Sequence, residues 1–146
     1  MRPTVDSALR TLAATLLGEI APEVRSSYRQ SSVQVVAIAT LIIATEYERA
    51  ADVRTWENAA IREILRRHAG LVADPTRRAR LEDAAASVDA DLLISTLDAA
   101  NADLERALID LHAEIEAIEA PAARDAEREV WTYLLESARR RSVRLG

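Results

Sequence analysis

The chain has 146 residues, about the length of one ordinary domain, and 49% of them are apolar while 29% are charged, a balance typical of folded rather than disordered proteins. It contains no cysteine, which excludes disulfides, thiolate metal sites and cysteine nucleophiles. The net charge of −5 does not attract a nucleic-acid backbone or an anionic membrane. We expect one domain, residues 1–146, with neither nucleic acid nor a membrane as its partner.

The start of the chain and its most apolar stretch predict a cytoplasmic protein. Asp6 and Glu19 interrupt the N-terminal segment, where a secretory signal would carry an unbroken apolar run. The most apolar stretch, residues 33–44, is shorter than the roughly 20 residues that span a bilayer. We therefore expect neither a signal peptide nor a transmembrane helix.

Residues that break helices are rare in this chain. It has three glycines and four prolines, whereas the helix-favouring residues Ala, Leu, Arg and Glu are abundant. The prolines lie between periodic segments, where each suits a first helical turn: Pro3, Pro22, Pro75 and Pro121. The expected fold class is all-α, a single-domain bundle of roughly five to six helices with antiparallel up-down packing and one long, coiled-coil-like helix.

Two helices are expected before residue 50. The first begins at Thr4 or Asp6 as its N-cap, carries apolar side chains at spacings of three and four, and ends near Pro22. The second covers residues 22–50, and its middle is apolar on nearly every side. Such a helix must be surrounded, either by its own bundle or by a second subunit.

A third helix is expected over residues 51–68. Asp52 or Thr55 is its expected N-cap, and Gly70 is placed to adopt the left-handed conformation just beyond its end. This interpretation makes the region around residue 50 a boundary between two helices.

A short charged helix is expected after Gly70. Asp74 and Pro75 form a cap and first-turn pair, and the helix runs to about residue 86. A second start near Ser87 or Asp89 is the alternative. Residues 74–90 therefore form either a separate short helix or part of one bent helix.

Residues 91–120 carry the most regular apolar pattern of the chain. Leucine and isoleucine recur at the heptad spacing of a coiled coil, with Asn101 as the single polar residue among them. A buried Asn in such a seam costs stability but can specify register or pairing. We expect an association seam formed by Leu97, Asn101, Leu104, Leu108, Leu111 and Ile115. A last helix then begins near Pro121 and ends in an arginine-rich C-terminus.

Two groups of side chains are candidate ligand sites. A pocket against the apolar second helix would be lined by Tyr28, Glu46, Tyr47 and Trp56. An anionic partner would be received by a patch of Arg62, Arg66, Arg67, Arg77, Arg78 and Arg80. The alternative for both groups is a solvated surface on which acidic and basic side chains pair with one another.

His112 and Glu116 have the i,i+4 spacing that a metal ion could bridge. Two ligands do not make a metal site, and a di-iron bundle needs Glu-x-x-His on each of two helices, whereas Ile109 precedes His112 by three positions. We interpret the two residues as a solvated surface pair and expect no metal site and no cofactor. No serine lies in a Gly-x-Ser-x-Gly motif, and no catalytic residue is expected.

The segment RPTVDSALRTLAATLLGEIAPEV, followed by the apolar helix and EYE near residue 48, resembles the start of a bacterial family of small uncharacterised helical proteins. Members of that family are often encoded beside kinase-like phosphotransferases and acyl-CoA dehydrogenases. The resemblance covers about the N-terminal third of the chain. It implies an accessory role near acyl-group or phosphotransfer metabolism and carries over no functional residue.

Association with another chain is the leading functional hypothesis. The heptad seam and the all-round apolar second helix both favour a homo-oligomer, most simply a dimer, or an accessory subunit on another protein. The alternative is a small-molecule-binding protein or enzyme with an apolar pocket between helices.

Overall fold

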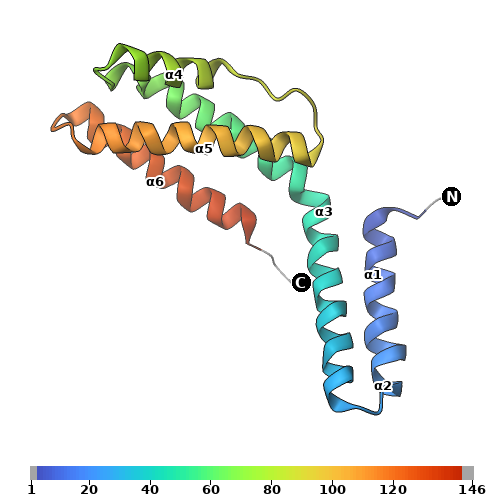
Figure 1. The fold of residues 1–146 in the computed structure, drawn as a ribbon. Helices are drawn as coiled ribbons and strands as arrows, with labels where there is room; N and C mark the ends of the chain where they lie inside the picture. Colours follow the sequence, from blue (N-terminus) through green and yellow to red (C-terminus); the bar gives the residue numbers. More distant parts are fainter. Residues whose placement is uncertain (1–2, 143–146) are drawn as a thin grey trace. The chain divides into compact units, whose positions relative to one another are not determined.

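The computed structural model describes residues 3–142 and shows an all-α chain, with no strand in that range (Figure 1). This confirms the expected fold class. In chain order the helices are α1 (Val5–Thr15), a π-helical turn (Leu16–Ile20), α2 (Ala21–Glu23), α3 (Ser27–His68), a 3₁₀-helical turn (Ala69–Leu71), α4 (Pro75–Ala86), α5 (Ile94–Glu116) and α6 (Pro121–Arg141). None of the helices described is both long enough and apolar enough to cross a membrane.

The described chain divides into two compact units. The hairpin unit, residues 3–50, contains α1, α2 and the first part of α3, and the bundle unit, residues 51–142, contains the rest of α3 with α4, α5 and α6. Helix α3 belongs to both units. The single domain expected for residues 1–146 stays a prediction.

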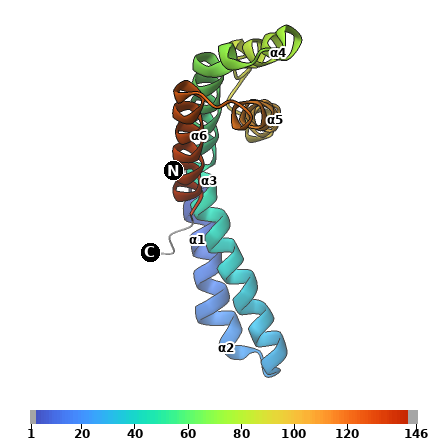
Figure 2. The ribbon, with the colours of Figure 1, turned by 90° about the vertical axis from the view of Figure 1, so that its left-hand side faces the viewer.

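The hairpin unit begins with a capped helix. The backbone N–H of Ser7 donates a hydrogen bond to Thr4 Oγ1 at 3.3 Å, which confirms Thr4 as the N-cap. A π-helical turn and α2 then carry the helical path to Glu23, with Pro22 in the first turn of α2. Figures 1 and 2 both show α1 alongside the first part of α3.

Helix α3 is longer than the sequence predicts. We expected separate helices over residues 22–50 and 51–68, but one helix of 42 residues runs from Ser27 to His68. Asp52 and Thr55, the expected caps, lie inside it. The prediction is wrong because a cap-forming side chain does not end a helix by itself, and α3 contains no glycine or proline to end it.

The end of α3 also differs from the expectation for Gly70. The chain leaves α3 through the 3₁₀-helical turn Ala69–Leu71, and no glycine within the described range has a positive φ. The predicted left-handed cap is therefore wrong. A tightened last turn satisfies carbonyl groups at a helix end without that conformation.

Helix α4 is a separate short helix, which confirms the first of the two alternatives predicted for residues 74–90. The backbone N–H of Arg77 donates to Asp74 Oδ1 at 2.8 Å, which confirms Asp74 as the cap. The second start near Ser87 or Asp89 is wrong, because residues 87–93 are irregular and α5 begins at Ile94. The hydroxyl of Ser87 instead donates to the Ala84 carbonyl oxygen at 2.7 Å, at the end of α4.

The core of the bundle unit lies where α3, α4, α5 and α6 meet. Helix α5 packs against both α4 and α6, and its heptad leucines join buried side chains of α3 and α6 in one cluster. The largest fully buried apolar side chains of this unit are Ile61, Leu65, Leu97, Leu104, Leu111, Ile115, Val72 and Val130. The regular apolar pattern of α5 therefore builds an intramolecular core.

Candidate functional site

The expected association seam lies inside the bundle unit. Its six residues are all buried: Leu97, Asn101, Leu104, Leu108, Leu111 and Ile115. The sequence predicts the buried stripe correctly, but side chains of the same chain cover it. The seam is therefore not a surface on which a second chain can bind.

Asn101 belongs to a buried polar network rather than to a pairing interface. Its Nδ2 donates to Asn58 Oδ1 at 3.0 Å, and Asn58 Nδ2 donates to Asp89 Oδ1 at 2.9 Å. Arg62 reaches the same carboxylate, with Nη2 at 2.6 Å from Asp89 Oδ1. Hydrogen bonds to Arg62 and Asn58 hold the pKa of Asp89 below its usual value against the opposing effect of burial.

Glu57 extends this network on α3. It is fully buried and accepts hydrogen bonds from Arg141 Nε and Nη2 at 2.6 and 2.7 Å, and from the Ser137 hydroxyl at 2.6 Å. Glu57 occupies a core position in the series Val53, Glu57, Ile61. A charged residue at an apolar position is the sequence signal for this network, although no polar network is among the features expected from the sequence.

The expected pocket does not form. Tyr28 and Tyr47 are both exposed on the hairpin unit, and 19 positions of helix separate them by about 28 Å along the axis. Trp56 lies in the bundle unit, where it stacks on Tyr133 with ring centroids 5.9 Å apart. Both residues line a shallow groove of about 270 Å³. The prediction is wrong because residues near one another in sequence spread along a single helix.

The expected anionic-partner patch is largely neutralised within the chain. The partners are Asp89 for Arg62, Glu63 for Arg66 and Arg67, Glu114 for Arg77, and the Val72 carbonyl oxygen for Arg78. Arg80 and Arg77 line a cleft of about 290 Å³ between α4 and α5, together with Asp110 and Glu114. Because acidic side chains share this surface, the alternative of a charged, internally paired exterior describes it better.

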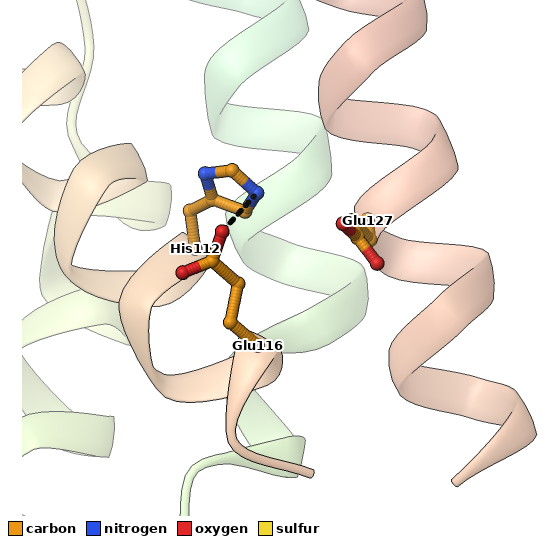
Figure 3. A group of neighbouring side chains, drawn as sticks. All are labelled: His112, Glu116 and Glu127. Atoms are coloured by element: carbon orange, nitrogen blue, oxygen red, sulfur yellow. Dashed lines mark ion pairs between the residues drawn. The ribbon is translucent and has the colours of Figure 1, made fainter. Parts of the chain in front are cut away.

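A third side chain joins His112 and Glu116. Glu127 projects from α6 toward the two residues on α5, as Figure 3 shows, and the three side chains each offer a ligand atom within 4.8 Å of the others. His112 Nε2 lies 3.6 Å from Glu116 Oε1. It is a buried atom with no hydrogen-bond partner. The expected solvated pair is therefore wrong for His112, whose ring also packs edge-on against Trp131 at 6.0 Å between centroids.

The hairpin unit carries an unusual distribution of side-chain sizes. Its buried residues are all small, within the part of the unit that the structure describes: Ala13, Ala21, Ala37, Thr40 and Ala44. Its larger apolar side chains are partly or largely exposed on α3, among them Val35 at 65% and Ile43 at 57%. Only alanine and threonine side chains are thus buried among the described residues of this unit, and each of its larger apolar side chains keeps some exposed surface.

Tyr28, Ser32, Val35, Ala39, Ile42 and Glu46 form what we call the outer face of α3. They recur at spacings of three and four, so they lie along one side of the helix. Val36, Ile38 and Ile43 flank them and are exposed. All of these residues belong to the hairpin unit.

Comparison of the chain with protein-family models, with curated proteins and with solved structures finds no match. The function must therefore be argued from the residues and contacts of the chain itself.

Proposed function

We propose that this chain acts through protein association, and that two copies pair through the outer face of α3. The observation that carries the proposal is the inverted size distribution of the hairpin unit, with alanines inside and Val35, Val36 and Ile43 outside. A two-helix unit of this kind leaves apolar area that a partner would remove from water. Burying each half-exposed apolar side chain contributes roughly 1 kcal/mol to the free energy of association. In a two-fold dimer both copies bury the same side chains, so each contribution occurs twice.

The spacing of large and small residues supports an antiparallel pair. Tyr28, Val35 and Ile42 repeat every seven positions, and the smaller Ser32 and Ala39 lie between them. When two copies run in opposite directions with Val35 opposite the second copy's Ala39, Ile42 falls opposite the second copy's Ser32. Val35 and Ile42 then each meet a smaller side chain, as knobs-into-holes packing requires, and Tyr28 falls opposite the second copy's Glu46.

The charges at the ends of the face support the same direction. Arg29 lies in the first turn of α3 and Glu46 lies at the far end of the outer face. An antiparallel pair brings each Arg29 beside the second copy's Glu46, whereas a parallel pair sets like charges together. Opposite charges at the ends of the outer face specify the antiparallel register more than they increase the affinity between the two copies.

The family resemblance of the N-terminal third covers this same hairpin unit. Because that resemblance implies an accessory role, we propose that pairing through α3 serves an accessory, non-catalytic function. The alternative of a small-molecule pocket gains no support from Tyr28 and Tyr47, which lie about 28 Å apart along α3.

The test is the molecular mass in solution of matched alanine-to-glutamate variants. Ala39 and Ala59 are both exposed on α3, but only Ala39 belongs to the outer face. We expect the wild type and Ala59→Glu to sediment at twice the chain mass of 16.1 kDa, and Ala39→Glu to sediment as a monomer with unchanged helical circular dichroism. A monomeric wild type, or equal dimerisation of the two variants, would overturn the proposal.

A further inference from the structure

We propose that His112, Glu116 and Glu127 form a binding site for a divalent transition-metal ion, with Zn²⁺ as the simplest occupant. The starting observation is the unsatisfied Nε2 of His112, a buried nitrogen without a hydrogen-bond partner. Leaving a buried polar group unpaired is unfavourable, and imidazole nitrogen is among the commonest metal ligands in proteins. A metal ion would remove this cost.

The second histidine of the chain, His68, differs from His112 because its ring nitrogen has a hydrogen-bond partner. His68 Nε2 lies 2.7 Å from Glu129 Oε2, so its ring nitrogen is satisfied by an ordinary carboxylate contact. Glu129 is in turn shared with Arg67, 2.6 Å away. Among residues 3–142, neither Glu116 nor Glu127 forms an ion pair with an arginine. The two carboxylates beside His112 are therefore available as ligands.

The distances suit a tetrahedral ion. Two ligand atoms that are each about 2.1 Å from Zn²⁺ lie about 3.4 Å apart at the corners of a tetrahedron. His112 Nε2 and Glu116 Oε1, at 3.6 Å, are near that spacing already. Glu127 contributes the third ligand from α6 (Figure 3), and the three ligand atoms, now within 4.8 Å of one another, would have to close to about 3.4 Å around the ion.

The donor set also selects the class of metal. One imidazole and two carboxylates suit Zn²⁺ and its first-row neighbours, whereas Ca²⁺ and Mg²⁺ prefer oxygen ligands alone. Three protein ligands leave one tetrahedral position for water or a further ligand. Glu116, whose side chain is 60% exposed, leaves the site accessible from solvent.

The test is Zn²⁺ titration of the full chain by isothermal calorimetry, with matched histidine variants. We expect one equivalent of Zn²⁺ to bind the wild type and His68→Ala, and saturable binding to be lost in His112→Ala and in Glu127→Gln. Glu127→Gln removes a ligand without changing side-chain size, so it keeps the test valid if His112→Ala unfolds. Bound Co²⁺ is expected to show the intense visible absorption of tetrahedral coordination.

Three results would overturn the proposal: no saturable Zn²⁺ binding to the wild type, binding that survives Glu127→Gln in a folded chain, or loss of binding in His68→Ala alone. Because the site lies wholly within the bundle unit, its occupancy is independent of the proposed pairing of α3.

Discussion

Arg141 binds the buried carboxylate of Glu57 through both Nε and Nη2, at 2.6 and 2.7 Å. The last turn of α6 is thereby attached to the C-terminal third of α3, and Arg141 Nη2 also lies 3.4 Å from Asn101 Oδ1 on α5. Three helices of the bundle unit thus share one polar contact. A buried ion pair of this kind stabilises little relative to apolar packing, but it is costly to break from one side.

Removal of Arg141 is expected to destabilise the chain. Arg141→Ala leaves Glu57 buried with only the Ser137 hydroxyl as a donor, and we expect urea unfolding to show a loss of about 2–3 kcal/mol. The control is Arg139→Ala, two positions away and 72% exposed at the side chain, with an expected change within about 0.5 kcal/mol. Equal effects of the two variants would show that the Glu57 contact contributes nothing.

Asp89 is expected to make stability depend on acidic pH. Its pKa in the folded chain is lowered, first by the hydrogen bond from Arg62, and in the unfolded chain it is about 3.9. The stabilisation is therefore fully present above the unfolded value and is lost as the pH falls through the lower folded value.

Asp89→Asn should accordingly be less stable than the wild type near neutral pH, by about 1–3 kcal/mol. The difference should shrink as the pH falls below about 4. Urea unfolding of both proteins over an acidic pH series measures it. A difference that stayed constant throughout the series would contradict the role assigned to the Arg62 contact.

The heptad pattern of α5 illustrates what could be predicted from the sequence. Apolar periodicity identifies which side of a helix is buried, and Leu97, Leu104 and Leu111 are indeed buried. Periodicity carries no information on whether the covering helix belongs to the same chain. The stripe was therefore correctly located and wrongly assigned to an intermolecular seam.

Signals between neighbouring residues, such as helix caps, predicted local structure, but they could not predict contacts between different helices. The Asp74 cap was predicted because it depends on neighbouring residues alone. The neighbourhood of His112 depends on Glu127, which lies on a different helix. No spacing within α5 could have revealed it.

Leu97→Ala should separate stability from association. Leu97 is fully buried, so we expect the substitution to lower the free energy of unfolding by about 2–5 kcal/mol. Because Leu97 contacts the interior of its own chain, the sedimentation mass of the folded protein should not change. A monomeric Leu97→Ala variant would restore the seam of α5 as the association surface.

The most direct test of paired α3 helices is a distance between two copies. The chain has no cysteine, so Tyr47→Cys provides a single attachment point for a spin label, beside the outer face. In the antiparallel register residue 47 falls opposite residue 27 of the second copy, about 20 helical positions from that copy's own label. The two labels should therefore be about 30 Å apart when measured by double electron–electron resonance. No intermolecular distance, or one below about 20 Å from a parallel pair, would contradict the account.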